Sequence, residues 1–431
     1  MLLEGLRNRP VTVWGNGIEG RAVTIFLEQR NCTVTVVEDP EQIPYSGVIV
    51  KSPGISIYRN DFKTARQYGA IFTSGTNLFM ESALLQPDYR PLLIGVTGTK
   101  GKSTTSALIA HLLREQGNRV ALCGNIGDPA INYANRLSDY EVVVVEMSSY
   151  QCADLQYAFD VSVVLNLYPE HIDWHKTHTQ YYKDKLNILE HRSPEQVAIL
   201  NSRDALTAMY VKNPRNAVYF DSLDTIHVLN GYFCNGKEKL FSTNVVPLRG
   251  DHNLSDVCAA LTAVEQAGGD LSLCEEALKT FKPLPHRLQT VEIKNGVTYV
   301  DDSISTTPET AIAAIKAFGY SRVILIAGGF EREQNYKELA AFVKKNGTKV
   351  IGLPQTGVRL VEDVTEAGGE AVLARNMQDA VAKASASARF GDIVLLSPAA
   401  PSYGVYKNFE ERGNAFAKFV GELEEKSLSG F

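Results

Sequence analysis

The residues most able to do chemistry in this chain are Lys102 and Ser103, which close a glycine-rich run over residues 95–103. Closely spaced glycines let backbone N–H groups turn towards an anion, and a following helix adds the partial positive charge of its N-terminus. The lysine can reach the outer phosphates of a nucleotide, and the serine hydroxyl can bind Mg²⁺. The run therefore predicts a phosphate-binding loop for ATP.

This loop departs from the strict pattern G-x-x-x-x-G-K-[ST], because Val96 stands where the first glycine would be. The apolar residues 92–94 predict a buried strand before the loop, and residues 106–114 predict a helix after it. The alternative is an ordinary glycine-rich turn between a strand and a helix. The Lys-Ser pair at the start of the helix favours nucleotide binding.

Two further predicted strands end in polar residues that could bind a metal ion. Residues 142–145 are four valines that lead into Glu146, and residues 161–165 lead into a segment that contains His171, Asp173 and His175. Ligands bind at the carboxyl ends of the strands in open α/β sheets. Oxygen donors with one or two imidazoles suit Mg²⁺. The alternative, a zinc site, is disfavoured because no cysteine lies near these histidines in the sequence. We expect His178 and His191 at the surface.

The N-terminal region carries a second glycine pattern, G-x-G-x-x-G, at Gly15, Gly17 and Gly20. A strand is predicted before it, a helix after it, and a further strand over residues 33–37 that ends at Glu38. This is the form of a dinucleotide fingerprint, and it predicts a ligand with a diphosphate without saying which one. The alternative is that these glycines serve only to pack helix against strand.

The remaining predicted strands divide the chain into three α/β domains. Short β-favouring runs over residues 297–300, 323–327 and 393–396 each precede a polar turn. We expect an N-terminal Rossmann-like domain over residues 1–90, a central P-loop ATPase-like α/β sheet over 91–290, and a C-terminal Rossmann-like domain over 291–431.

Composition narrows the class of protein. The net charge of −6 gives no electrostatic case for nucleic acid as a partner. No apolar run approaches the length of a membrane span, and the first residues lack the features of a secretory signal. The six cysteines are scattered, as is typical of reduced, buried side chains. We expect a cytoplasmic monomer.

At this point the chain resembles the Mur ligases, ATP-dependent enzymes that add amino acids to UDP-N-acetylmuramic acid in peptidoglycan synthesis. The resemblance covers nearly the whole chain and looks most like the glutamate-adding members. Its motifs, in order, are T-G-T-K-G-K-S at 97–103, G-N-I-G at 124–127, E-M-S-S-Y-Q at 146–151, E-H-I-D at 170–173, L-P-H-R at 284–287, D-S at 302–303 and K-N-F-E-E-R-G at 407–413.

The resemblance implies a role for each matched residue. The UDP moiety of UDP-N-acetylmuramoyl-L-alanine would lie against Gly17, Ile18 and Glu38, and Asn125 would help to hold the muramyl part. Residues implied to contact ATP are Gly98, Thr99, Lys100, Gly101, Lys102, Ser103, Thr104, Asn253, Arg287 and Asp302. The family has a second asparagine where Asp256 stands, which puts contacts with adenine there in doubt.

The resemblance also implies the metal site. Ser103, Glu146 and His171 would arrange Mg²⁺, and Lys185 matches a family lysine that reacts with CO₂ to form a carbamate. A carbamate is an anionic oxygen ligand for a second Mg²⁺, which an ammonium group cannot be. Lys102, His171 and Lys185 would be the catalytic residues. An ordinary solvated lysine is the alternative for Lys185.

The implied reaction follows from the chemistry of acyl transfer. A carboxylate is a poor acyl donor, so ATP would first phosphorylate it, and an amine would then attack the acyl phosphate to release phosphate. Positive charge around the transferring phosphoryl group would lower the barrier.

Three segments of the C-terminal region depart from the D-glutamate ligases. Ile304 replaces a lysine, G-G-F-E-R at 328–332 replaces G-G-D-x-K, and P-S-Y-G-V-Y occupies 401–406. Arginine offers a planar fork where lysine offers a point charge, so the carboxylate clamp should move. These segments resemble the branch that adds L-glutamate, and we therefore predict L-glutamate as substrate. The candidate substrate residues here are Thr306, Arg332, Ser402 and Phe409.

Four alternatives stay open from the sequence. They are a D-glutamate ligase of the same family, a folylpolyglutamate synthase, a non-catalytic nucleotide-binding partner and an NAD-dependent dehydrogenase. Residues 1–90 argue against the second, retention of Lys102, Glu146, His171 and Lys185 argues against the third, and the last depends on the fingerprint alone.

Overall fold

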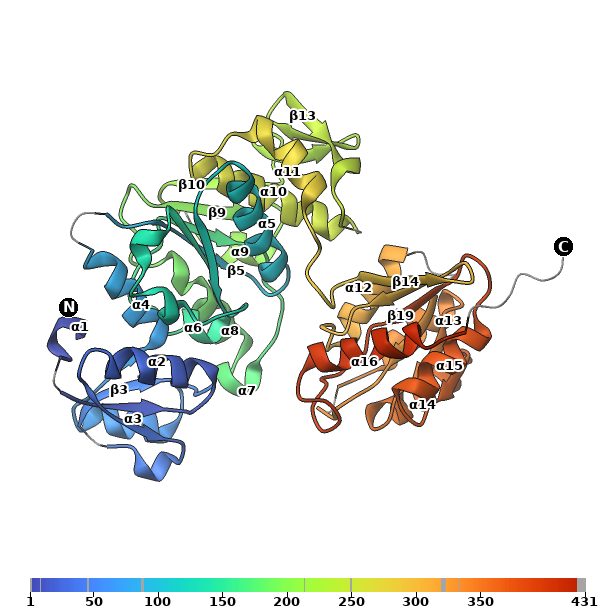
Figure 1. The fold of residues 1–431 in the computed structure, drawn as a ribbon, viewed down its shortest axis with the longest axis horizontal. Coiled ribbons are helices and arrows are strands. Elements are labelled where there is room, and N and C mark those ends of the chain that lie inside the picture. The colour runs from blue at the N-terminus through green and yellow to red at the C-terminus, as the bar shows by residue number, and fades with distance from the viewer. Residues whose placement is uncertain are drawn as a thin grey trace. The chain divides into compact units, whose positions relative to one another are not determined.

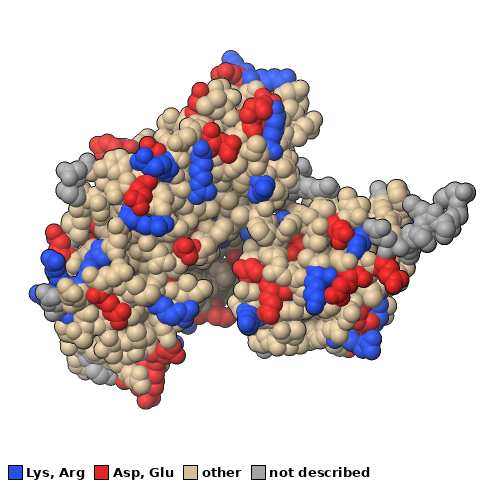
Figure 2. Space-filling view, in the orientation of Figure 1, with Lys and Arg blue, Asp and Glu red and all other residues tan. Residues whose placement is uncertain are grey.

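The computed structural model describes residues 2–7, 9–44, 46–86, 89–212, 214–248, 250–318, 323–332 and 334–424. The chain divides into two compact units, one of residues 1–247 and 252–281 and the other of residues 248–251 and 282–431. Figure 1 colours the first unit from blue to yellow and the second from orange to red. On the face in Figure 2, acidic and basic side chains are interspersed.

The first unit contains two parallel sheets. The N-terminal sheet has the order β2-β1-β3-β4, and the central sheet has the order β10-β9-β8-β5-β7-β6. Their strands are β1 (Pro10–Trp14), β2 (Thr33–Val37), β3 (Gly47–Lys51), β4 (Ala70–Ser74), β5 (Leu92–Thr97), β6 (Val120–Gly124), β7 (Val142–Glu146), β8 (Val161–Val164), β9 (Val197–Asn201) and β10 (Ala217–Phe220).

Helices connect these strands, as expected for parallel pairing. The helices of the first unit, of which α1, α10 and α11 lie outside these connections, are α1 (Leu2–Gly5), α2 (Ile18–Glu28), α3 (Asn60–Gln67), α4 (Gly75–Leu84), α5 (Lys102–Glu115), α6 (Ser149–Cys152), α7 (Ile172–His175), α8 (His178–Leu186), α9 (Ala205–Tyr210), α10 (Asp251–Gln266) and α11 (Cys274–Thr280). The four valines of β7 are all buried, because helices cover both faces of a parallel sheet.

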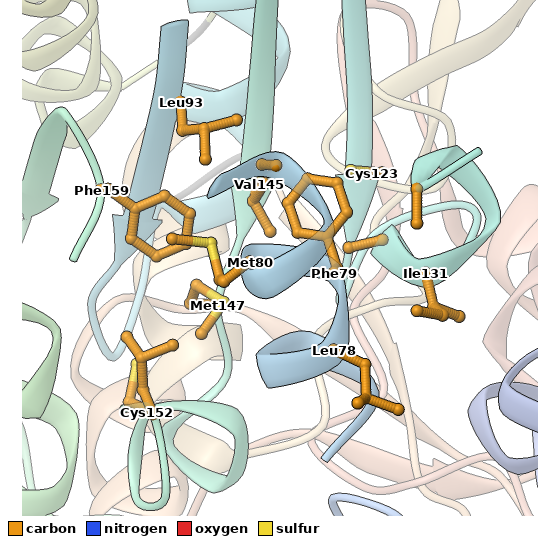
Figure 3. Close-up of a cluster of buried hydrophobic side chains, with 14 of the residues drawn as sticks. Leu78, Phe79, Met80, Leu93, Cys123, Ile131, Val145, Met147, Cys152 and Phe159 are labelled. Carbon is orange, nitrogen blue, oxygen red and sulfur yellow. The ribbon is translucent and has the colours of Figure 1, made fainter. Parts of the chain in front are cut away.

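Helix α4 joins the two parallel sheets into one core. Its residues from Gly75 to Ala83 are all buried. Leu78, Phe79 and Met80 belong to the same hydrophobic cluster as Val145 of the central sheet (Figure 3). The cluster also includes Val11 and Val13 of β1. One continuous core therefore fixes the position of the N-terminal sheet relative to the central sheet.

The first unit also holds a small antiparallel sheet that the alternating strand–helix expectation for residues 91–290 missed. Its strands are β11 (Ile226–Leu229), β12 (Tyr232–Asn235) and β13 (Glu238–Ser242). The first hairpin turns at Asn230 and Gly231, both of which have positive φ. An Asn-Gly pair is a strong signal for a two-residue hairpin, and it was present in the sequence.

The second unit is a six-stranded sheet of order β14-β15-β19-β16-β17-β18, in which only the β14–β15 pair is antiparallel. The strands are β14 (Gln289–Lys294), β15 (Val297–Asp301), β16 (Val323–Ala327), β17 (Lys349–Gly352), β18 (Ala371–Leu373) and β19 (Ile393–Leu396). The helices are α12 (Pro308–Phe318), α13 (Lys337–Lys345), α14 (Thr356–Glu366), α15 (Met377–Ser387) and α16 (Phe409–Gly421).

The α/β fold class predicted from the sequence is confirmed, with a separate parallel or mixed sheet in each of the three predicted regions. The domain boundaries at residues 90 and 290 stay a prediction. All six cysteines are buried and form no disulfide. Among the described residues, none of the helices is both long and apolar enough to cross a membrane.

Candidate active site

The phosphate loop joins β5 to α5, as the sequence predicted. Gly101 adopts φ +84° immediately before the helix begins at Lys102, a conformation that favours glycine. The Lys102 ammonium group folds back over the loop and donates to the carbonyl oxygens of Gly98 at 2.9 Å and Thr99 at 3.0 Å. The loop thus places a cation and a helix N-terminus together, which suits a phosphate group.

Side chains that follow β8 hold this loop in shape. The Asn166 side chain accepts from the backbone N–H of Lys100 at 2.8 Å and donates to the carbonyl of Lys100 at 3.0 Å. The Thr99 hydroxyl lies 2.8 Å from the Tyr181 hydroxyl, and the Lys100 ammonium group pairs with Glu170. The loop is therefore preorganised by the neighbouring strand and by α8.

Glu146 presents one free carboxylate oxygen beside the phosphate loop. Strands β7 and β8 pair with β5 on its two sides, so the predicted proximity of the two polar clusters to the loop is confirmed. Glu146 is fully buried, and its Oε1 accepts from the Asn125 amide at 2.6 Å. Its Oε2 is buried without a hydrogen-bond partner. A buried, unpaired carboxylate oxygen is costly unless a cation binds it.

His171 offers a neutral imidazole. It has φ +55°, and its Nδ1 lies 2.9 Å from the Tyr150 hydroxyl. Although 44% of its side chain is exposed, partial burial, assisted by the charges of Lys185 and Lys102, lowers the pKa of His171 to about 4 despite the nearby Glu170. The ring is therefore neutral at neutral pH, which a metal ligand requires.

Lys185 lies on α8 beneath the phosphate loop. Its side chain is 2% exposed, and its ammonium group donates to the carbonyl of Gly98 at 3.0 Å. Lys102 donates to the same carbonyl, so the structure brings the two lysines together. Burial and then the charge of Lys102 lower the pKa of Lys185 to about 7. A substantial fraction of Lys185 is therefore neutral at pH 7, and the neutral amine is the form that reacts with CO₂.

The donor set fits a magnesium ion. The unpaired oxygen of Glu146, the neutral ring of His171 and the hydroxyl of Ser103 at the start of α5 offer hard or borderline ligands near one loop. Among the described residues, no three or more His, Cys, Asp or Glu side chains group as a metal site. A magnesium site here would therefore use the Ser103 hydroxyl as well as Glu146 and His171.

Helix α10 packs against the same loop. A Cβ atom on Gly101 would lie 2.2 Å from Oδ1 of Asp256, so the carboxylate is in close contact with the loop backbone. Asn253, on the same helix, is 6% exposed. Asn253, the predicted nucleotide contact, thus lies on the helix that packs against the phosphate loop. Asp256, one turn further along this helix, places its carboxylate beside the loop.

The N-terminal fingerprint forms the expected tight turn. Gly15 has φ +99°, and a Cβ on Gly20 would lie 1.9 Å from the Gly15 carbonyl oxygen, so α2 packs closely on the turn. Gly17 faces open space, Ile18 is 69% exposed, and Glu38 is exposed at the end of β2. Gly17 and Ile18 follow the carboxyl end of β1, and Glu38 follows that of β2, its neighbour in the sheet.

Two glycine substitutions separate the structural and binding roles of this turn. We expect Gly20→Ala to destabilise the first unit by about 3 kcal/mol, because the new methyl group overlaps the Gly15 carbonyl. Gly17→Ala has open space and should cost only about 1 kcal/mol or less, the penalty for alanine at the N-cap of α2, while raising KM for the ligand that the fingerprint is predicted to bind. Thermal unfolding and steady-state kinetics on both variants check this, and equal stability of the two would contradict the packing argument.

In the second unit, the three segments that depart from the D-glutamate ligases converge. They follow β15, β16 and β19, which are neighbours in the sheet. The N–H of Ala399 donates to the carbonyl of Ser305 at 3.1 Å, and the N–H of Phe330 donates to that of Pro401 at 2.8 Å. The candidate substrate residues on these loops thus lie at the carboxyl ends of neighbouring strands in the sheet.

A buried arginine stabilises this group of loops. Arg412 on α16 is 1% exposed and donates to the carbonyls of Ser303 at 2.7 Å and Ala400 at 2.9 Å. Burial lowers the pKa of Arg412 to about 10. The Ser303 hydroxyl donates to the carbonyl of Phe409 at 2.8 Å, so the first residue of α16 is held against the loop after β15.

The other predicted residues of this unit lie around the same loops. Arg332 is exposed, with its guanidinium 5.6 Å from the ring centre of Tyr403, and Ser402 is buried. Burial raises the pKa of Asp302 to about 6, while hydrogen bonds from serines and the charge of Arg287 oppose the shift. The Thr306 carbonyl accepts from the Gln334 amide at 2.9 Å.

Sequence reasoning did not single out several residues that shape the site. They are Tyr150, Asn166, Tyr181, Asp184 and Arg412. Asn166 is the first polar residue after the strand predicted over residues 161–165, but no role was assigned to it. Tyr150 and Arg412 lie within the motifs at 146–151 and 407–413, but their contacts could not be predicted, because the partners of Arg412, like that of Tyr181, are distant in the sequence.

Comparisons with known proteins place this chain among its relatives. The Mur ligase middle domain matches residues 96–264, and the Mur ligase, glutamate ligase domain matches residues 286–400. The UDP-N-acetylmuramoyl-L-alanine--L-glutamate ligase of Xanthomonas campestris pv. campestris (strain 8004) is 37% identical over 97% of this chain and 91% of its own length. The protein of the same name from a Micromonospora species is 36% identical over 97% and 98% of the two chains.

Solved structures share the fold. A MurF ligase from Thermotoga maritima in complex with ADP has a TM-score of 0.60 and 19% identity, covering 90% of this chain and 97% of that one. A folylpolyglutamate synthase from Mycobacterium tuberculosis has a TM-score of 0.59 and 16% identity, and covers 82% of this chain and 96% of its own.

The structural likeness shows the fold alone, whereas the sequence matches cover almost the whole chain and include candidate residues in each of the two units. The phosphate loop lies in the middle-domain match, and the loops after β15 and β16 lie in the glutamate-ligase match. The chain belongs to the Mur ligase family.

Proposed function

We propose that this ligase joins L-glutamate to UDP-N-acetylmuramoyl-L-alanine at the expense of ATP. The observation that carries the chemistry is that Glu146, His171 and Lys185 come from different elements and all border one phosphate loop. We propose these substrates because relatives of 35–37% identity are named UDP-N-acetylmuramoyl-L-alanine--L-glutamate ligase. The convergent loops of the second unit, where the sequence departs from D-glutamate ligases, support the choice of L-glutamate.

The proposed reaction begins with transfer of the terminal phosphoryl group of ATP to the substrate carboxylate. Lys102 and the backbone N–H groups at the start of α5 bind the phosphates and offset the charge that builds up on them. Bound Mg²⁺ supplies further charge neutralisation on the phosphates. The amino group of glutamate then attacks the acyl phosphate, the new amide bond forms, and inorganic phosphate leaves.

We also propose that Lys185 acts as a carbamate. Its pKa of about 7 leaves the amine partly neutral, so its nitrogen can attack CO₂ and release one proton. The product carries a negative charge and two oxygen atoms under the loop, where Glu146 has a further unpaired oxygen. Ser103, Glu146, His171 and this carbamate would together hold two magnesium ions.

Recognition of glutamate is assigned to the second unit. Arg332 is an exposed cation at the loop edge, and its guanidinium can bind a carboxylate through two parallel hydrogen bonds. Thr306, Ser402 and Phe409 lie on the loops and helix that Arg412 joins together. We further propose that the enzyme works as a monomer in the cytoplasm, where its six free, buried cysteines would stay reduced.

The test is phosphate release with ATP, Mg²⁺ and UDP-N-acetylmuramoyl-L-alanine, with L-glutamate or D-glutamate in parallel reactions. We expect turnover with L-glutamate and at least tenfold less with D-glutamate, because a moved carboxylate clamp loses about 1.4 kcal/mol or more with the wrong enantiomer. Turnover with D-glutamate alone would contradict the stereochemical proposal. No turnover with either would contradict the function as a whole.

A further inference from the structure

A chain of hydrogen bonds runs through the core of the first unit beneath the candidate metal ligands. The Nδ1 atom of His175 lies 2.5 Å from Oδ2 of Asp184, and its Nε2 atom lies 3.0 Å from the Ser149 hydroxyl. His175 is 0% exposed, Ser149 is 3% exposed and Asp184 is 4% exposed. We call these three residues the buried relay.

The chemistry of the two partners sets the direction of the hydrogen bonds. A carboxylate only accepts, so the Nδ1 atom of His175 carries the proton that bonds to Asp184. In the neutral ring the Nε2 atom then accepts from the Ser149 hydroxyl. Serine, histidine and aspartate in this order resemble a nucleophilic triad. Burial of all three members keeps a substrate carbonyl from reaching Ser149, so a positioning role fits and a nucleophilic one does not.

Each member of the buried relay lies within four residues of a candidate metal ligand in the sequence. Ser149 begins α6, three residues after Glu146. His175 ends α7, four residues after His171. Asp184 directly precedes Lys185 on α8. One buried imidazole therefore joins the three segments that carry Glu146, His171 and Lys185.

The relay continues to the N-terminal sheet. The Tyr58 hydroxyl donates to Oδ1 of Asp184 at 2.6 Å, and the Ser56 hydroxyl donates to the carbonyl of Trp174 at 2.7 Å. The indole N–H of Trp174 donates to the carbonyl of Gly54 at 3.1 Å. The loop after β3 thus contacts the same segments.

We propose that His175 is a positioning residue that holds the segments carrying Glu146, His171 and Lys185 in the arrangement that binds the divalent cation. The proposal rests on the proposed function, because it takes these three residues as ligands. Removing one partner from a buried hydrogen-bonded pair leaves the other unsatisfied, so the segment that carries it must shift to find a new partner. Residues that hold metal ligands in place through hydrogen bonds change metal affinity by about 10–100-fold when they are replaced.

The test uses two substitutions that each keep one half of the relay. In His175→Asn the side-chain amide can replace Nδ1 and keep the bond to Asp184. In His175→Gln it can replace Nε2 and keep the bond to Ser149. The matched control is His178→Asn, because His178 is exposed at the first position of α8. The measurement is the Kd for Mn²⁺ in the presence of ADP, followed by the electron paramagnetic resonance signal of free Mn²⁺, with a melting curve for each variant.

We expect both His175 variants to bind Mn²⁺ at least about tenfold more weakly than the native protein, and the His178 control to bind it equally well. In kinetics, the Mg²⁺ concentration for half-maximal rate should rise more than kcat falls. Unchanged Mn²⁺ affinity in both variants would overturn the proposal. If either variant fails to fold, Ser149→Ala decides, because it removes a single hydroxyl: weaker Mn²⁺ binding supports the relay and equal binding overturns it.

Failure of the proposed function gives a different result. The Mn²⁺ titration contains neither the muramyl substrate nor glutamate, so native protein that binds Mn²⁺ but does not use L-glutamate counts only against the choice of substrate. Native protein that does not bind Mn²⁺ with ADP overturns the relay proposal together with the metal assignment.

Discussion

Lys185→Ala is expected to lower kcat by about 10²–10³-fold, the effect typical of removing one preorganised group that stabilises a transition state. The physical reason is the loss of the proposed carbamate oxygens, because Lys185 is buried next to the phosphate loop. The measurement is steady-state phosphate release at saturating ATP and Mg²⁺. Lys183→Ala is the matched control, because Lys183 is exposed on the same helix and should keep native activity.

The same prediction has a pH dependence with a defined sign. Carbamate forms from the neutral amine, and the pKa of Lys185 is about 7, so the reactive fraction rises as the pH increases through 7. At limiting bicarbonate the native enzyme should therefore gain activity from about pH 6 to about pH 8, and added bicarbonate should reduce the difference. With ¹³C-labelled bicarbonate, a carbamate carbon signal should appear in the native protein and be absent from the alanine variant. Native activity in the variant, or no such signal at any pH, would contradict the carbamate.

Glu146→Gln is expected to change activity and stability in opposite directions. Oε2 of Glu146 is a buried carboxylate oxygen with no hydrogen-bond partner, so the charge costs stability in the protein without bound cation. The neutral amide should raise the free energy of unfolding by about 1 kcal/mol, while loss of the anionic ligand should lower kcat by about 10²–10³-fold.

The control for this pair of effects is Glu141→Gln. Glu141 lies just before the same strand, is 41% exposed and already accepts from the backbone N–H of Arg119 at 2.8 Å, so its replacement should change neither quantity appreciably. Chemical unfolding in the presence of a chelator and phosphate-release kinetics are the two measurements. A less stable Glu146 variant would show that the carboxylate is satisfied without a cation.

Local pattern was enough to predict most strands of the parallel sheets. The strands over residues 323–327 and 393–396 begin and end where the sequence predicted them, because a buried parallel strand needs a continuous apolar run. The edge strand over residues 33–37 is mostly exposed and was predicted by its β-branched residues. The hairpins of β11, β12 and β13 were missed although the Asn-Gly turn was visible. Helix α4 was assigned to the N-terminal region, and no sequence pattern indicated that its buried residues also pack against the central sheet.

The candidate site was predicted by residue type, whereas its electrostatics were not. The phosphate loop, Glu146, His171 and Lys185 were named from spacing and resemblance, and their assignments as ligands stay a prediction. Nothing local could show that Lys185 donates to the same carbonyl as Lys102, or that Glu146 has one oxygen without a partner. Such properties depend on which distant segments pack around a group.

The sequence by itself determined the family, the order of the strands along the chain and the loop that can bind a nucleotide, since each depends on residues close together in the chain. Only the tertiary structure decided that β7 and β8 lie on either side of β5, that Arg412 joins the loops of the second unit, and that His175 connects three separate segments. The physical reason is that burial, hydrogen-bond partners and neighbouring charges, which set a side chain's affinity for protons and cations, come from residues remote in sequence.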